Sequence, residues 1–539
     1  MNRTPWRRKA PLLAGLLIMA TESMQPTIQA AEAVNYASTY DVKRGEVLAA
    51  READWRNGAI VYQVFVDRFA PANDLDAKRS LYAAPRRLRT WDEQPTRGSL
   101  DETAGVWSHE LDFWGGDLAS LRGKLDYIQH LGADVLYLNP ICQALTNHKY
   151  DAQDYFTVAP EYGTRADVAA LATDLHGRDM RLVLDGVFNH VGRTSPWFLD
   201  AVQDPESPYR NWFYIGDEYA DGHRGWADVA NLPELCLENP AVRARIWGDA
   251  DSVVQSYLRD GVDGWRLDVA TDLGFNYLAE LTRAAHAARP GSLVVGENWV
   301  YPEEWSPSLD AVMNFYYRQI LVHLLAGEMS GAHAGRLIER MIADTGLDPV
   351  LKAWVILDNH DLARIGTVWP KPWRRHMAQA LQFTLPGSPC VYYGAELGMT
   401  GGDDPEMRGP MRWDLATDAN EELAWMRRLI ALRRGNRALR IGDFRLLDSE
   451  RVLAFMRRTD RAADTTVIVA NATGKTVTDV LPIRDSKVMN WGWLIDELGD
   501  VRVQVKSGIA KVEVPAHTVC VLRPEIPAGR GHNPYKRMQ

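Results

Sequence analysis

The sequence is poor in cysteine. It has four, Cys142, Cys236, Cys390 and Cys520, and none of them belongs to a CxxC pair. Structural zinc sites use closely spaced cysteine pairs, so this spacing argues against a zinc site. Four distant cysteines in a chain of 539 residues do not require disulfides, even in an oxidising compartment, and none is predicted.

The chain also lacks any large block of one charge. The formal net charge is −10, and the basic runs, such as Arg86-Arg87 and Arg374-Arg375, are only two or three residues long. A nucleic-acid partner usually leaves a broad basic footprint on the protein. We therefore expect no nucleic-acid partner.

Long apolar runs are missing as well. The one distinct run, Pro11–Ala20, follows a basic start that includes Arg7 and Arg8, and small residues occur around Ala30 and Ala31. Such a run is too short to cross a bilayer but is typical of an export signal; a membrane anchor or a buried helix is the alternative. We predict a signal peptide over residues 1–33, a periplasmic or secreted protein, and no membrane span in the mature chain.

Short β-rich apolar runs alternate with helical patterns through the middle of the chain. Eight such runs separated mostly by helices indicate an α/β protein with a (β/α)8 TIM barrel. The predicted strands are Ile60–Val66, Asp134–Leu138, Arg181–Val187, Val262–Asp268, Leu293–Glu297, Asp310–Asn314, Ala353–Leu357 and Cys390–Tyr393. The predicted helices include Leu118–Leu131, Arg165–His176, Ala241–Arg259 and Tyr277–Ala288.

The pattern changes in two places. A segment rich in Pro, Trp, Tyr and Asp follows the third strand, and a loop of that length is more often a small domain. Alternating strands near the C-terminus indicate an antiparallel β domain, which we expect to be a β-sandwich. The predicted boundaries are 50–190 and 240–438 for the barrel, 191–239 for the inserted domain, 439–525 for the β domain and 526–539 for a loose tail.

Four acidic residues fall where predicted barrel strands end. Asp185, Asp268 and Glu297 end the third, fourth and fifth strands, and Asp361 follows the seventh. Active sites of such barrels lie at the carboxyl ends of the strands, so these acids should share one bowl. Crowded carboxylates raise one another's proton affinity, which suits acid and base catalysis.

Polar neighbours support a site at the same ends. Arg266 lies two residues before Asp268 and should share its face of the strand, where a guanidinium would hold that carboxylate ionised. His190 and His360 add hydrogen-bonding groups next to the acids. The 19 tryptophans also offer flat faces for sugar rings, although most tryptophans pack in cores.

Four segments in order carry a family resemblance: DGVFNH (185–190), GWRLD (264–268), GEN followed by Trp299, and NHD (359–361). Together they resemble the conserved regions of the α-amylase family, glycoside hydrolase family 13. The likeness extends from about Trp55 to Trp413. It is closest to the branch of neopullulanases, cyclomaltodextrinases and maltogenic amylases, including periplasmic amylases.

The resemblance implies a retaining α-glucoside hydrolase and assigns roles to matching positions. Asp268 would be the nucleophile, Glu297 the acid/base and Asp361 the stabiliser of the distorted sugar. The implied substrate-binding residues are Tyr150, His148, His190, Arg266, His360, Trp299 and Arg364, and Asp185 and Asn189 would organise the site. No cofactor is needed for this chemistry.

The implied substrates are maltooligosaccharides, cyclodextrins, starch or pullulan, cut at α-1,4 bonds. The resemblance does not decide whether α-1,6 bonds are cut as well. Transglycosylation or isomerisation through the same covalent intermediate is an alternative. A non-catalytic glucan-binding relative is another, although all three acids are present.

Two further expectations follow from the resemblance. The family often binds structural Ca²⁺ between two loops, here at Asn73, Asp74, Gly115 and Asp117, although the same residues are common in turns and caps. Glu234 and Cys236 in the inserted domain, and Thr271 and Asp272 after the nucleophile, depart from the branch pattern. We expect these four departures to narrow the range of substrates.

Overall fold

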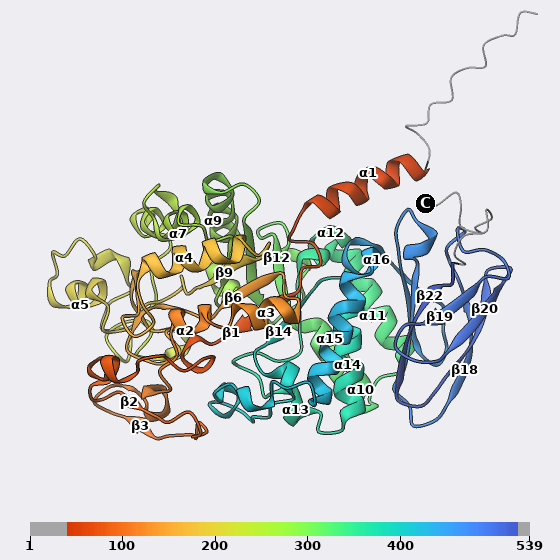
Figure 1. Ribbon diagram of the computed structural model, residues 1–539. Helices are drawn as coiled ribbons and strands as arrows, with labels where there is room; N and C mark the ends of the chain where they lie inside the picture. The colour runs from red at the N-terminus through yellow and green to blue at the C-terminus, as the bar shows by residue number, and fades with distance from the viewer. Residues whose placement is uncertain (1–39, 527–539) are drawn as a thin grey trace, which may run out of the picture. The chain divides into compact units, whose positions relative to one another are not determined.

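The computed structural model describes residues 40–526, and the described residues from Arg44 to Ile526 form one compact unit. Eight parallel strands close into a barrel in the order β1-β14-β13-β12-β11-β10-β9-β6, which confirms the predicted fold class (Figure 1). The barrel strands are β1 (Val61–Val64), β6 (Val135–Leu138), β9 (Arg181–Gly186), β10 (Gly264–Leu267), β11 (Leu293–Asn298), β12 (Ala311–Asn314), β13 (Trp354–Ile356) and β14 (Ser388–Tyr392). Each lies within two residues of a predicted strand at either end.

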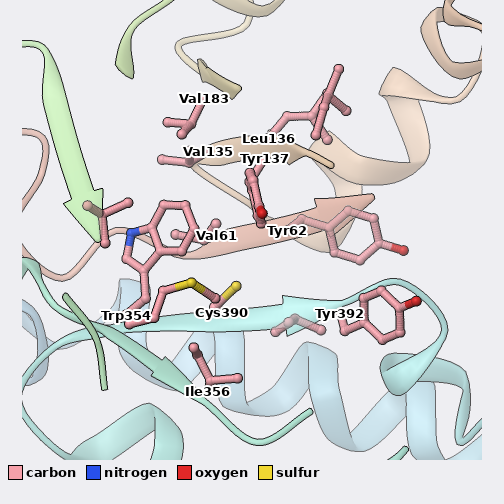
Figure 2. Close-up of a cluster of buried hydrophobic side chains, with 14 of the residues drawn as sticks. Val61, Tyr62, Val135, Leu136, Tyr137, Val183, Trp354, Ile356, Cys390 and Tyr392 are labelled. Carbon is pink, nitrogen blue, oxygen red and sulfur yellow. The ribbon is translucent and has the colours of Figure 1, made fainter. Parts of the chain in front are cut away.

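Apolar side chains fill the inside of the barrel and the space beneath its helices. Val61 on β1 pairs with Val135 on β6 and with Cys390 on β14, and all three are almost fully buried. The rings of Tyr137 and Trp354 lie 5.0 Å apart across this cluster (Figure 2). Strands covered on both faces need such near-continuous apolar runs, which is why the sequence signal was strong.

Helices α4, α9, α12 and α14 lie outside the barrel strands (Figure 1). The helices are α1 (Tyr40–Ala53), α2 (Leu118–Arg122), α3 (Leu125–Leu131), α4 (Arg165–His176), α5 (Pro196–Gln203), α6 (Pro240–Arg243), α7 (Val253–Arg259), α8 (Ala270–Leu273), α9 (Phe275–Ala288), α10 (Phe315–Ala326), α11 (Gly331–Thr345), α12 (Leu347–Lys352), α13 (Ile365–Val368), α14 (Pro372–Thr384), α15 (Glu421–Arg434) and α16 (Arg437–Ile441). Among the described residues, no helix combines the length and the hydropathy needed to cross a bilayer.

Two predicted helices are broken. The segment expected as Leu118–Leu131 is split into α2 and α3, because the chain leaves the helical conformation between Gly123 and Leu125. The segment expected as Ala241–Arg259 is interrupted by a wider π-turn and an extended Asp249 before Ser252 caps α7. Helical periodicity continues across both breaks, so it could not reveal them.

Two insertions lie on the side of the barrel where the strands end. The first, between β1 and α2, contains β2 (Arg87–Leu88), β3 (Leu100–Asp101), β4 (Val106–Trp107) and β5 (Asp112–Phe113). The second is the inserted domain after β9, which holds α5. A further hairpin, β7 (Cys142–Ala144) and β8 (Ala152–Val158), follows β6. The sequence indicated the second insertion and missed the β3–β4 hairpin, whose strands are only two residues long.

The C-terminal domain is one curled antiparallel sheet of eight strands with its own apolar core. Its strands are β15 (Asp443–Leu446), β16 (Leu453–Arg458), β17 (Thr466–Asn471), β18 (Val477–Pro482), β19 (Trp493–Asp496), β20 (Arg502–Lys506), β21 (Ile509–Val514) and β22 (Thr518–Pro524). The predicted signal peptide, and the predicted tail beyond residue 526, lie outside the described residues. The four cysteines lie within them and are unpaired.

Candidate active site

Arg266 lies at the centre of a group of carboxylates at the carboxyl ends of β9, β10 and β11. Its side chain is fully buried, and its Nη1 atom is 2.9 Å from Asp185 Oδ1 and 3.0 Å from Asp268 Oδ1. Its Nη2 atom is 2.9 Å from Glu297 Oε2. Nη1 donates hydrogen bonds to Asp185 and Asp268, whereas Nη2 is paired with Glu297 by charge and distance without hydrogen-bond geometry, so one guanidinium contacts three acids from three adjacent strands.

Glu297 has two further donors. Trp299 Nε1 donates to Oε1 at 2.9 Å, and the backbone N–H of Val269 donates to Oε2 at 3.0 Å. Val269 reaches this position with a left-handed φ of 39°, directly after Asp268. The Trp299 ring stacks on Phe315 with centroids 3.7 Å apart and remains half exposed, so one face is free toward the cavity.

Asp185 is hydrogen-bonded to two tyrosines beneath the site. It accepts hydrogen bonds from Tyr137 at 2.5 Å and from Tyr150 at 2.9 Å. The Tyr150 ring stacks parallel to His360, 5.3 Å between centroids, and stacks on His148 at 5.7 Å. Asp185 therefore connects Arg266 to Tyr150 and is itself buried, which fits the organising role expected for it.

Asp361 faces the cavity and has an exposed carboxylate. His360 Nε2 lies 3.2 Å from Oδ2, and Arg408 Nη2 lies 3.5 Å from Oδ1. Arg408 is also paired with Asp404 at 2.9 Å, and Asp404 accepts from His109 at 3.0 Å. The sequence did not single out Arg408 or Asp404. They lie in the long loop after β14, where no strand end marks them.

His190 contacts the inserted domain. Its ring stacks on Trp226 with centroids 5.5 Å apart, and its buried Nε2 has no hydrogen-bond partner among the described residues. Burial lowers the pKa of His190 to about 3, so its ring is neutral at neutral pH. Asn189 is buried beside it, and its backbone oxygen accepts from Leu235 N at 2.9 Å. An unpartnered neutral imidazole at a cavity wall suits a sugar hydroxyl.

Burial raises the pKa of Asp268, and the charges of Glu297, Asp185 and Asp361 act in the same direction, while Arg266 opposes them. Burial, Arg266 and Arg408 also lower the pKa of His360, so this ring too is neutral. The raised pKa of Asp268 reflects this crowding of carboxylates in a buried site, an arrangement typical of sites that carry out acid and nucleophile chemistry.

These side chains open into one cavity of about 620 Å³. Its volume lies within the range of roughly 300–1,000 Å³ typical of small-ligand sites. The lining combines the acids with apolar side chains from both insertions and comprises Leu100, Gly105, Val106, Trp107, Glu110, His148, Tyr150, His190, Trp226, Val229, Asn231, Leu232, Asp268, Val269, Thr271, Asp272, Glu297, Trp299, His360, Asp361, Asp404 and Arg408.

Three expected site residues lie elsewhere. Arg364 is fully buried behind the site, where Nη1 donates to the Tyr393 backbone oxygen at 2.7 Å, and it does not line the cavity. Arg408 supplies the cavity-facing guanidinium instead. Glu234 pairs with Arg224 at 2.5 Å and Cys236 contacts Glu238, and neither lines the cavity. Of the four departures from the branch pattern, only Thr271 and Asp272 do.

Both carboxylates expected to bind calcium, Asp74 and Asp117, already have partners within the chain. Asp117 caps α2 through Ser120 N, and its carboxylate is bonded to the ammonium of Lys78. The same ammonium lies 3.3 Å from the Glu161 backbone oxygen. The carboxylate of Asp74 accepts from Ala77 N within its own turn. Lys78 thus provides the positive charge that a metal ion would bring, and the described residues hold no cluster of His, Cys, Asp and Glu suited to a metal.

Comparison with known proteins agrees with this geometry. Residues 63–428 match the model of the alpha amylase catalytic domain. A cyclomaltodextrinase from a Bacillus species is 33% identical over 77% of this chain and 73% of its own length. Neopullulanase 2 of Thermoactinomyces vulgaris is 30% identical over 89% of this chain and 80% of its own.

Solved structures give the same result. The cyclic alpha-maltosyl-(1→6)-maltose hydrolase of Arthrobacter globiformis superposes with a TM-score of 0.73 and 27% identity, over 87% of this chain and 99% of that one. The residues matched by the family model, 63–428, contain the acids of the site described above. The chain belongs to the α-amylase family and is a glycoside hydrolase.

Proposed function

We propose that this protein hydrolyses α-1,4 glucosidic bonds of maltooligosaccharides and related α-glucans with retention of anomeric configuration, through a covalent glucosyl-enzyme. Asp268 is the nucleophile, Glu297 the acid and base, and Asp361 the stabiliser of the reacting sugar. The relatives named as cyclomaltodextrinase and neopullulanase support α-glucans as the substrate class.

One observation carries this assignment. The Arg266 guanidinium contacts the carboxylates of both Asp268 and Glu297, on adjacent strands of the same barrel. A retaining glycosidase needs two carboxyl groups about 5 to 5.5 Å apart, one ionised and one protonated. The shared guanidinium brings both carboxylates to one point of the barrel, and membership of the α-amylase family supports their assignment as the retaining pair.

The two acids divide the chemistry. The Asp268 carboxylate attacks the anomeric carbon, the bond to the leaving oxygen breaks, and Glu297 gives its proton to that oxygen. In the second half, the Glu297 carboxylate takes a proton from water, the water oxygen attacks the anomeric carbon, and Asp268 is released. Two inversions give net retention. The exposed carboxylate of Asp361 favours the positive charge that develops on the ring.

Proton NMR in the first minutes of maltotriose hydrolysis tests the mechanism. We expect the α-anomer to form first, and an initial β-anomer would contradict the roles of Asp268 and Glu297. Glu297→Gln should reduce reducing-sugar release by at least about a hundredfold, the scale of general acid catalysis. Glu339→Gln, at an exposed position on α11, is the matched control and should match the unaltered enzyme.

We also propose that the protein is exported. The support is the basic start and the apolar run within residues 1–33. Cell fractionation of the full chain, alongside a form lacking these residues, tests it. If the protein is exported, the full chain gives activity outside the cytoplasm and the form lacking residues 1–33 does not. Equal activity of both forms in the cytoplasmic fraction would contradict export.

A further inference from the structure

A short hairpin beside the active site contributes to the lining of the cavity. It consists of β3, β4 and the turn between them, residues 100–107, with Leu100 paired to Trp107 and Asp101 to Val106. Asp101 forms the turn: its Oδ1 accepts from Thr103 N at 3.1 Å and from Ala104 N at 3.0 Å. The hairpin belongs to the insertion between β1 and α2, and no catalytic acid lies on it.

The tip of this 100–107 hairpin is tied to the inserted domain. Arg193 Nη2 donates to the Thr103 backbone oxygen at 3.0 Å. The backbone N–H of Arg193 in turn donates to Asn231 O at 3.0 Å, inside the inserted domain. Gly105 packs so closely on the guanidinium that an added Cβ would lie 2.6 Å from Cζ. The two insertions therefore meet at the cavity, with Arg193 as the connection.

The base of the hairpin is bonded to the active site itself. Trp107 N donates to Glu110 Oε2 at 2.8 Å, and the other oxygen of Glu110 lies 3.5 Å from His148 Nε2. His109 bonds Asp404, which is paired with Arg408. The hairpin thus lies on the side of the cavity that holds His148 and Arg408. The acid Glu297 is bonded instead to Trp299, whose half-exposed ring lines the cavity.

Apolar side chains of the hairpin are left exposed where they face this space. Leu100 is 56% exposed and Trp107 is 41% exposed, and Val229 of the inserted domain is 40% exposed. All three line the cavity. Exposed apolar groups that line a cavity rimmed by polar residues mark a ligand surface.

We infer that the 100–107 hairpin, tethered by Arg193, is a specificity-determining wall that ends the glycone side of the cleft. Under the proposed function, on which this inference rests, the leaving group lies on the Glu297 and Trp299 side. The sugars on the non-reducing side of the cut bond then run toward the hairpin and can extend only a few units. The enzyme cuts linear glucans near their non-reducing ends, and the interiors of polymers and closed rings fit poorly.

Two variants alter the 100–107 hairpin without changing a catalytic acid. Arg193→Ala removes the tether, and replacement of residues 101–105 by Gly-Gly removes the tip. Arg178→Ala is the matched control, because Arg178 bonds only Asp126 and Gln129 on the outer helical layer among the residues described. Substrates are maltotriose, amylose and γ-cyclodextrin, and the readouts are reducing-sugar release, loss of iodine staining and product length.

With the unaltered enzyme, we expect reducing sugar to appear well before amylose loses its iodine stain, with products of one short length. With both hairpin variants, amylose should lose its iodine stain at a smaller extent of reaction than with the unaltered enzyme. The variants should also raise kcat/KM for γ-cyclodextrin relative to maltotriose by at least about fivefold. Arg178→Ala should leave both quantities unchanged.

The outcomes distinguish the two proposals. An unaltered enzyme without activity on maltotriose would contradict the proposed function. An active enzyme whose two hairpin variants stay within about twofold of it in the cyclodextrin ratio, with the same product lengths, would overturn the wall alone. If one variant does not fold by circular dichroism, the other decides.

Discussion

The Arg266 guanidinium lies between three buried carboxylates, those of Asp185, Asp268 and Glu297, and is itself fully buried. Its Nη1 atom donates to Asp185 and Asp268, and its Nη2 atom lies 2.9 Å from Glu297. Positions on three strands therefore depend on one planar group, and the geometry of nucleophile and acid is set by a residue that does not itself react.

We predict that Arg266→Lys lowers kcat/KM by at least about a hundredfold, because one ammonium cannot replace two nitrogens aimed at three acids. The matched control is Arg364→Lys, which alters a buried arginine bonded to a backbone oxygen outside the cavity. The control should lose stability in thermal unfolding but keep most of its activity at 25 °C. Equal losses of activity in the Arg266→Lys and Arg364→Lys variants would contradict the role of Arg266 in positioning the acids.

The raised pKa of Asp268 gives a second prediction at this scale. A nucleophile must be ionised, so activity falls as pH drops through the pKa of Asp268. Because burial and the neighbouring acids raise that pKa, the acidic limb of kcat/KM should lie above about 3.9, the ordinary value for Asp. Assays across pH with return to neutral pH separate this titration from acid unfolding. A limb at or below the ordinary value would contradict it.

The sequence predicted the acids well and the loop residues poorly, for a physical reason. Asp185, Asp268 and Glu297 end buried parallel strands, and the closed barrel leaves such positions only one place to meet. Arg408 lies in a loop whose path depends on tertiary contacts, such as its bond to the His360 backbone oxygen at 2.8 Å. Arg364 is close to the acids in sequence, yet it turns behind the site.

At the scale of elements, the two insertions are held by side chains from distant segments. Lys78, on the first insertion, bonds the Asp117 carboxylate at the start of α2 and lies near the Glu161 backbone oxygen. The cap at Asp117 could be predicted from sequence, since Asp commonly begins helices. The ammonium that bonds it could not, because Lys78 is 39 residues away in the chain.

We predict that this connection replaces a metal ion. The melting temperature of the purified enzyme should be the same with EDTA as with added CaCl₂. Lys78→Ala leaves Asp117 buried without its cation and should lower the free energy of unfolding by about 1–3 kcal/mol, the scale of an unsatisfied buried polar group. Lys371→Ala, at an exposed position before α14, is the control and should leave the free energy of unfolding unchanged. A melting temperature that falls in EDTA and recovers with Ca²⁺ would contradict the prediction.

At the scale of the whole molecule, the C-terminal sheet and the barrel share part of one core. Phe455 on β16 and Val521 on β22 belong to the same buried cluster as the barrel side chains. Trp373 at the start of α14 stacks on His517 with centroids 3.8 Å apart. The sequence indicated two domains from the change in periodicity. It could not indicate a shared core, because apolar strand faces do not reveal what covers them.

We predict that the barrel and the C-terminal sheet unfold together. Arg457 on β16 is fully buried and donates to the backbone oxygens of Thr384 at 3.0 Å and Gly442 at 3.0 Å, which ties the sheet to the end of α14. Calorimetry should therefore show one transition, and Arg457→Met should shift the whole of it downward because two buried carbonyls lose their donor. Arg502→Met, at an exposed pair with Glu525 on the sheet, should leave it in place. Two transitions, of which Arg457→Met moves one, would mean that the sheet folds on its own and that the shared apolar contacts are too weak to couple it to the barrel.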